Sequence, residues 1–250
     1  MSTHYHLVGN YISPYVRKVL VCMALKGLEY TIDPIAPFVG NERFSALSPL
    51  RRIPVLIDGE RVINDSSVIC QYLDERHPQP PLYPADIGDR AQARWIEEYC
   101  DSWIGDVVIW GMFFQKGAKR HLFGEEPDEA IIARARDEQL PVALDYLESL
   151  LPAEGFVFGE LGIADISIAS FFRNAAFVRY AVDAQRWPRV AALLERAWAL
   201  PVFRKLAELE EKCLRTPLAE QRKVLMELGA PVSLETLGTS TARRGVMRLG

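Results

Sequence analysis

The sequence lacks the features that mark a secreted, membrane-embedded or nucleic-acid-binding protein. Its N-terminus has neither the basic start nor the apolar run of a signal peptide, and no stretch approaches the length of a membrane span. The formal net charge is −4, so the chain carries no excess of positive charge for binding a polyanion. These absences favour a cytoplasmic protein that binds neither nucleic acid nor membrane.

Cysteine is also scarce, and its spacing does not indicate a metal or redox centre. None of the four cysteines belongs to a C-x-x-C pair, and no His lies beside them at metal-ligand spacing. Free cysteine in a reducing compartment behaves mostly as a small buried apolar side chain. We therefore predict four free, buried cysteines and no metal site. They are Cys22, Cys70, Cys100 and Cys213.

What is present is typical of a globular protein of one or two domains. The chain has 250 residues, of which 49% are hydrophobic and 25% charged. It contains no internal repeat and no low-complexity run. Residues 77–84 hold four prolines, a composition that cannot continue a helix and that predicts a linker.

The residues before this linker alternate between strand and helix patterns. Ser13 and Pro14 are typical of a helix start, and Gly27 is typical of its end. Asp58-Gly59 lies between two apolar runs, which indicates a hairpin. The order strand, helix, strand, hairpin, helix resembles the thioredoxin fold. We expect strands at 5–8, 29–32, 55–57 and 61–63, and helices after Ser13, at 42–47 and at 66–76.

After the linker, apolar residues recur at steps of three or four, which predicts an all-helical domain. Pro141 predicts a kink or break within the helical pattern there. The last residues contain one more possible helix at 218–228 and then a tail that we expect to be solvated. The predicted domains are 1–79, 86–215 and a C-terminal extension at 216–250.

Three short motifs before the linker suggest a binding site for a peptide. Pro54 keeps backbone groups out of a regular strand ladder, so they are free to pair with the main chain of a ligand. The helix that opens at Asp65-Ser66 offers unpaired N–H groups and a positive dipole end to a carboxylate. The three motifs are Ser13-Pro14-Tyr15, Arg52-Ile53-Pro54 and Asp65-Ser66.

In order and spacing these motifs resemble the glutathione site of the cytosolic glutathione transferases. The resemblance covers about residues 4–213 and is strongest in the first 77. The Ser-Pro-Tyr motif looks like the serine-using pattern of tau- and theta-like members. The resemblance implies an α/β thioredoxin-like N-terminal domain, an all-α helical-bundle C-terminal domain and a homodimer. It also implies glutathione as co-substrate, activated without a metal for attack on a small hydrophobic electrophile.

The resemblance assigns activation of the glutathione thiol to Ser13. A hydroxyl can donate one hydrogen bond to sulfur while accepting another, and the following helix points its positive end to the same place. A plain helix cap is the competing interpretation of this serine. Tyr5 and Tyr11 are rival hydroxyl groups, since some classes of the family use a tyrosine. A serine at this position cannot form a mixed disulfide, which disfavours thiol transfer.

By the same resemblance the other two motifs bind the backbone and the charges of glutathione. Ile53 would pair its main chain with the cysteinyl part, beside a cis Pro54. Ser66 would bind the γ-glutamyl carboxylate, and Asp65 would face the ammonium group. A helix cap is the alternative role for this pair.

The two arginines before this proline have different expected roles. Arg52 could contact the glycyl carboxylate of glutathione, and the alternative is a solvated surface charge. Arg51 stands where a glycine is frequent in the family, so we expect the loop to run differently here.

The resemblance places the second substrate between the two domains. Aromatic side chains at the end of the first long helix are candidate walls, with helical core packing as the competing interpretation. A basic run follows them and suggests electrophiles that carry an acid group, with a solvated loop as the alternative. The candidate walls are Trp110, Phe113 and Phe114, with Tyr11 at the mouth of the pocket, and the basic run is Lys116, Lys119, Arg120 and His121.

Two other functions stay open at this point. A glutathione-dependent isomerase or dehalogenase would use the same thiolate with a different pocket. A non-catalytic binding or regulatory protein could retain the fold, as the stringent-starvation and translation-factor relatives do. Retention of Ser13 and Asp65-Ser66 argues against this last function.

Overall fold

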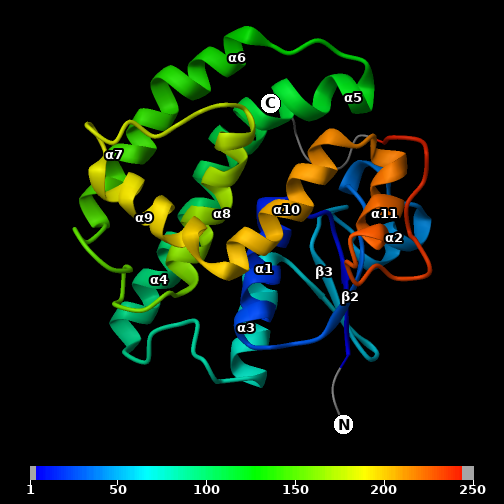
Figure 1. Ribbon diagram of the computed structural model, residues 1–250, viewed down its shortest axis with the longest axis horizontal. Helices are drawn as coiled ribbons and strands as arrows, with labels where there is room; N and C mark the ends of the chain where they lie inside the picture. The colour runs from blue at the N-terminus through cyan, green and yellow to red at the C-terminus, as the bar shows by residue number, and fades with distance from the viewer. Residues whose placement is uncertain (1–3, 244–250) are drawn as a thin grey trace. The chain divides into compact units, whose positions relative to one another are not determined.

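The structure, a computed structural model, describes residues 4–243 (Figure 1). The chain divides into two compact units, one made of the residues up to 80 together with those from 201 onward, and the other of Pro81–Leu200. The thioredoxin-like fold followed by helices is confirmed. The predicted helical domain at 86–215 differs from this division, because residues 201–215 belong to the first unit.

The first unit is built on a four-stranded sheet of order β2-β1-β3-β4. The central strand β1 pairs in parallel with β2 and antiparallel with β3, which forms an antiparallel hairpin with β4. The hairpin turn falls at Gly59-Glu60, one residue later than expected. The strands are β1 (Tyr5–Val8), β2 (Tyr30–Asp33), β3 (Val55–Asp58) and β4 (Arg61–Asn64).

The register of this sheet lines up four strand ends. Val8 at the end of β1 lies opposite Asp33 at the end of β2 and opposite Val55 at the start of β3. Val55 in turn lies opposite Asn64 at the end of β4. The segments that follow β1, β2 and β4 and the segment that precedes β3 therefore leave the sheet at the same end.

Each helix of the N-terminal part begins at a residue whose side chain caps it. Ser13 caps α1, Asn41 caps α2 and Asp65 caps α3, each by accepting hydrogen bonds from backbone N–H groups of the first turn. The predicted starts of all three helices are confirmed. The helices are α1 (Pro14–Leu25), η1 (Pro37–Val39), α2 (Glu42–Leu47) and α3 (Ser66–Arg76).

The C-terminal part of the first unit contains α10 (Pro201–Arg215), α11 (Leu218–Glu227) and a segment that returns to the sheet. In Figure 1 the red segment after α11 lies beside β2 and α2. The N–H of Ile32 donates to the carbonyl of Pro231 at 2.8 Å, and the N–H of Ser233 donates to the carbonyl of Ile32 at 2.9 Å. The expectation of a solvated tail is therefore wrong for the backbone of the described segment, because β2 is an edge strand whose free backbone groups this segment pairs. The rest of the predicted tail, 244–250, lies outside the described residues.

The second unit is all-helical, as predicted. Its central helix, α8, buries twelve of its fifteen residues, including Phe171 and Phe172. Pro141 lies where η3 gives way to α7, which matches the predicted break. The elements are α4 (Ile87–Tyr99), η2 (Cys100–Ala118, with π-type hydrogen bonds), α5 (Lys119–Phe123), α6 (Glu129–Arg134), η3 (Ala135–Gln139), α7 (Leu140–Leu150), α8 (Ile163–Phe177) and α9 (Pro188–Ala199).

Two expectations about the whole chain can be compared with the structure. All four cysteines are free and buried, as predicted. Among residues 4–243, no helix combines the length and the apolar character that crossing a membrane would require.

A buried ion pair joins α1 to α10 inside the first unit. Arg17 donates through Nε to a carboxylate oxygen of Glu210, and the two side chains are 1% and 2% exposed. Burying two charges carries a desolvation penalty, which their mutual attraction offsets. Removing one partner is strongly destabilising, because the other charge then stays buried without that compensation.

We predict that Arg17→Met destabilises the protein by about 3–5 kcal/mol, since the Glu210 carboxylate keeps its burial and loses the guanidinium. The double variant Arg17→Met/Glu210→Leu should recover most of this loss. Urea unfolding monitored by circular dichroism measures both. A single variant as stable as the wild type would show that this ion pair does not tie the two helices.

Candidate functional site

Ser13 lies in the turn between β1 and α1, with a partly exposed side chain. Its hydroxyl oxygen accepts from the N–H of Val16 at 3.4 Å, and its carbonyl accepts from the N–H of Arg17 at 2.9 Å. The serine is thus a helix cap, as the competing interpretation expected. This role uses only an acceptor site of the hydroxyl, so its proton can still be donated to a ligand at the positive end of α1.

The backbone before Ser13 is held by Asn10. The carbonyl of Asn10 accepts from the N–H of Ser13, and its side-chain oxygen accepts from the N–H of Ile12, both at 3.0 Å. Gly9 allows this turn to pass close to α1, since a Cβ there would lie 2.5 Å from Cγ2 of Val16. Asn10 was not among the predicted site residues, because its role depends on a contact pattern that composition does not reveal.

The Ile53–Pro54 peptide bond is cis, as the resemblance implied. The ladder between β1 and β3 begins at Val55, so the main chain of Ile53 lies just outside it. Ile53 itself is buried, which fixes the direction of this backbone. The segment can present main-chain groups to a peptide, as Pro54 led us to expect.

Arg51 retains the backbone conformation that a glycine would adopt. Its φ is +50°, in the left-handed region that disfavours side chains with a Cβ. The guanidinium donates to the carbonyl of Gly40 at 2.8 Å and to the hydroxyl of Ser45, and it lies over the ring of Phe44. These contacts of a buried side chain stabilise a strained turn directly before Arg52 and Ile53.

Asp65 and Ser66 form the start of α3. Asp65 has a φ of +76°, and its Oδ1 accepts from the N–H groups of Ser67 and Val68 at 2.9 and 3.2 Å. Ser66 is 2% exposed, and within the described part of the chain its hydroxyl has no hydrogen-bond partner. A strained residue next to an unsatisfied buried hydroxyl is typical of a ligand-binding site.

A buried lysine adds positive charge near this helix start. Lys18 of α1 is fully buried, and its Nζ donates to the hydroxyl of Ser67 at 3.0 Å. Sequence reasoning did not select Lys18. A lysine on the otherwise apolar face of a predicted helix was the signal that could have found it.

The two rival tyrosines are placed differently from Ser13. The hydroxyl of Tyr5 is hydrogen-bonded to Nε2 of His77 at 2.8 Å, and Tyr5 opens β1 at the end of the strand away from Ser13. Tyr11 is 1% exposed, with its hydroxyl beside Tyr30, and burial raises its pKa far above the ordinary value. Ser13, in contrast, has a partly exposed side chain at the start of α1.

The other predicted site residues differ in exposure and contacts. Arg52 is exposed. The rings of Trp110 and Phe114 are tilted at 56° with their centres 5.5 Å apart, and the ring centre of Phe113 lies 6.1 Å from that of Phe177. Arg120 of the basic run pairs with Glu126 at 3.7 Å. The roles of these residues toward a second substrate, like that of Tyr11, stay predictions.

Comparisons with known proteins show what this chain is similar to. Residues 7–81 match the family model of the glutathione S-transferase N-terminal domain, and residues 129–196 match that of the C-terminal domain. Glutathione S-transferase Z2 of Arabidopsis thaliana is 30% identical over 203 residues, which cover 79% of this chain and 87% of that protein. The crystal structure of a glutathione S-transferase from Rhodospirillum rubrum F11 has a TM-score of 0.73 and 28% identity, and the match covers 81% of this chain and 91% of that one. The chain belongs to the glutathione S-transferase family.

The relatives also bear on class and activity. Maleylacetoacetate isomerase of Pseudomonas aeruginosa is 29% identical over 215 residues, which cover 82% of this chain and 93% of that protein. A zeta-class glutathione S-transferase of Euphorbia esula is 30% identical over 194 residues, which cover 74% of this chain and 82% of that protein. These similarities do not select the tau- or theta-like subclass that the Ser-Pro-Tyr motif suggested.

The left-handed turn at Arg51 gives a prediction with a matched pair of variants. Arg51→Gly and Arg51→Ala both remove the guanidinium, but only alanine keeps a Cβ in the left-handed region. We expect Arg51→Ala to be about 1 kcal/mol less stable than Arg51→Gly. Urea unfolding of the two variants measures the difference, and an alanine variant as stable as the glycine variant would contradict it.

Proposed function

We propose that this protein is a glutathione transferase that activates the glutathione thiol at Ser13 and transfers the glutathionyl group to a small hydrophobic electrophile. The observation that carries the proposal is the alignment of strand ends, because it brings the turn at Ser13, the cis Ile53–Pro54 segment and the unsatisfied hydroxyl of Ser66 to one end of the sheet. A tripeptide with a thiol in its centre needs this combination of groups.

The binding roles follow from the groups on offer. The main chain of Ile53 would pair with the cysteinyl residue, and the hydroxyl and N–H of Ser66 would bind the γ-glutamyl carboxylate at the start of α3. Asp65 caps α3 through Oδ1, which leaves Oδ2 for the ammonium group. The exposed guanidinium of Arg52 would reach the glycyl carboxylate.

The chemical step requires the thiolate. A thiol with a pKa of about 8.5 is only about 3% ionised at pH 7. A site that lowers this pKa by about two units contributes roughly 2.7 kcal/mol and makes the thiolate the main species. Donation of the Ser13 proton to sulfur, together with the positive end of α1, supplies this stabilisation. Sulfur then attacks the electrophile, and the protein forms no covalent bond of its own.

The proposed electrophile pocket is lined by aromatic side chains. Tyr11, Trp110, Phe113 and Phe114 are the proposed walls. The pairing of Arg120 with Glu126 lowers the net charge of the basic run, so a preference for acidic electrophiles receives little support from this loop. Comparing the turnover of neutral and carboxylated electrophiles tests whether the protein prefers electrophiles that carry an acid group.

Isomerisation is the alternative reaction, and the similarity to maleylacetoacetate isomerase of Pseudomonas aeruginosa favours it. In an isomerase the thiolate would add to the substrate and then leave it, so that glutathione is regained. Conjugation consumes one glutathione per turnover. Measuring the glutathione remaining after complete conversion of the substrate distinguishes the two reactions, which share Ser13 and the site around it.

Removal of the Ser13 hydroxyl tests the activation step. We expect Ser13→Gly to lower kcat about 10- to 100-fold, because a hydrogen bond to a charged group is lost. Glycine is tolerated as a helix cap, so the loss of fold stability should be only a few tenths of a kcal/mol. Ser13→Thr keeps a hydroxyl and is the matched control. Full activity of the glycine variant in a steady-state conjugation assay would exclude Ser13 as the activating residue.

We also propose a homodimer in the cytoplasm, on the strength of the family and of the exposed apolar side chains of the first unit. Leu50 is 54% exposed and Val68 is 52% exposed, in the α2–β3 loop and in the first turn of α3. We expect sedimentation to give the mass of a dimer for the wild type and a shift toward the monomer for Leu50→Glu. A wild-type monomer would contradict the proposal.

A further inference from the structure

Residues 218–243, here called the C-terminal clamp, consist of α11 and the segment that returns to the sheet. Both family models end at or before residue 196, so the clamp lies beyond them. Its backbone is hydrogen-bonded to β2 and to the segment after β2: the N–H of Asn41 donates to the carbonyl of Leu237 at 2.7 Å, and the N–H of Thr239 donates to the carbonyl of Val39 at 2.6 Å. The clamp therefore follows the chain from the end of β2 to the start of α2.

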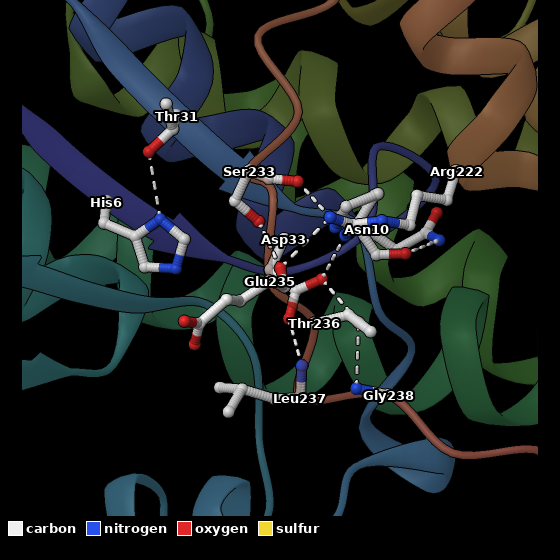
Figure 2. A network of polar contacts seen from close by, with 11 residues as sticks. His6, Asn10, Thr31, Asp33, Arg222, Ser233, Glu235, Thr236, Leu237 and Gly238 are labelled. Carbon is white, nitrogen blue, oxygen red and sulfur yellow. Dashed lines mark hydrogen bonds and ion pairs between the residues drawn. The ribbon is translucent and has the colours of Figure 1, made fainter.

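The carboxylate of Asp33 holds the clamp at the end of the sheet where the proposed glutathione site lies. Figure 2 shows donors from the clamp converging on it. Oδ1 accepts from Nη1 of Arg222 at 3.0 Å and from the hydroxyl of Thr236 at 2.9 Å, and Oδ2 accepts from the N–H of Leu237 at 2.6 Å. Asp33 is 1% exposed, so these donors take the place of water. A buried carboxylate with this set of partners fixes the clamp in one position.

One residue of the clamp contacts the turn that carries Ser13. The side-chain oxygen of Gln221 accepts from Nδ2 of Asn10 at 3.0 Å, and both residues are 5% exposed. The Nε2 of Gln221 donates to the carbonyls of Cys213 at 2.8 Å and Thr216 at 3.2 Å. Because its nitrogen is bound to the end of α10, the amide of Gln221 keeps its oxygen directed at Asn10.

Asn10 transmits this contact to Ser13. With Nδ2 bound to Gln221, Oδ1 of Asn10 is left to accept from the N–H of Ile12, while the carbonyl of Asn10 accepts from the N–H of Ser13. The position of the Ser13 hydroxyl therefore depends on an amide of α11, 211 residues further along the chain than Asn10.

The clamp also reaches the second proposed binding segment. Gly40, next to the Asn41 that pairs with Leu237, accepts through its carbonyl from the buried guanidinium of Arg51. Arg51 stabilises the turn before Ile53–Pro54. The C-terminal clamp is therefore connected to Ser13 through Asn10, and to the turn before the cis-proline through Gly40 and Arg51.

We propose that the C-terminal clamp is part of the glutathione site and that Gln221 is a positioning residue, which acts through Asn10 to aim the Ser13 hydroxyl at the glutathione sulfur. This inference rests on the proposed function, because it assigns a purpose to Gln221 only if Ser13 activates a bound thiol. A misplacement of about 1 Å in such a donor can cost up to about 100-fold in rate.

The substitution Gln221→Met matches the length of the side chain and removes both amide groups. It leaves Nδ2 of Asn10 buried without its nearest acceptor, and the carbonyl of Pro34, at 3.5 Å, is a poor replacement. Rotation of the Asn10 amide to find an acceptor takes Oδ1 away from the N–H of Ile12. The turn then loses the contact that orients Ser13, whereas Ile53 and Ser66 keep their groups for binding glutathione.

The test compares variants by ultraviolet titration of enzyme-bound glutathione thiolate, by kcat and by calorimetric affinity for glutathione. For Gln221→Met we expect about tenfold less bound thiolate at neutral pH and a kcat lowered by a similar factor, with the Kd for glutathione within about threefold of wild type. Gln221→Glu keeps an oxygen acceptor for Asn10 but loses the two donations to the carbonyls of Cys213 and Thr216, so its thiolate and kcat should fall no further than those of Gln221→Met. Lys223→Ala, on the exposed face of the same helix, should change neither.

The outcomes separate this inference from the proposed function. In the double variant Ser13→Ala/Gln221→Met, the bound thiolate should be no lower than in Ser13→Ala, because Gln221 acts through Ser13. Wild-type thiolate in a Gln221→Met enzyme that binds glutathione would overturn the inference. Wild-type thiolate in Ser13→Ala, or a wild-type protein that does not bind glutathione, would reject the proposed function and this inference with it.

Discussion

The alignment of four strand ends is the constraint on which the candidate site depends. Val8 lies opposite both Asp33 and Val55, and Val55 lies opposite Asn64. A shift of one residue in any of these pairings would turn side chains to the other face and displace the segment attached to that strand. The site is therefore a product of sheet register, with each binding group carried on a short segment that begins or ends at this row.

Two residues at this end of the sheet have a strained backbone, one of them buried and the other exposed beside a buried serine. Arg51 and Asp65 both have positive φ, and each is stabilised by its own side chain, through the guanidinium contacts of Arg51 and the helix-capping carboxylate of Asp65. Conformations of this kind persist only where the surrounding contacts determine them strongly. Nearby, the hydroxyl of Ser66 is buried and unsatisfied within the described residues, and the hydroxyl of Ser13 accepts from the N–H of Val16.

The features that depend on neighbouring residues could be predicted from the sequence, whereas those that depend on long-range contacts could not. Helix caps such as Ser13 and the break at Pro141 depend on neighbouring residues, so the sequence indicates them. The cis bond at Pro54 followed only from the resemblance to a family. The docking of residues 230–243 could not be predicted, because Thr236 pairs with a carboxylate 203 residues away and the segment has no periodic pattern. The left-handed backbone at Arg51 depends on contacts with Gly40, Phe44 and Ser45, which the sequence does not indicate.

A crystal structure of the protein with bound glutathione tests the central claim most directly. If the register of the sheet builds the site, the sulfur will lie within hydrogen-bond distance of the Ser13 hydroxyl, with the γ-glutamyl carboxylate on Ser66 and the cysteinyl main chain on Ile53. A sulfur placed beside the hydroxyl of Tyr5 or Tyr11, or a site that stays empty at saturating glutathione, would contradict the claim.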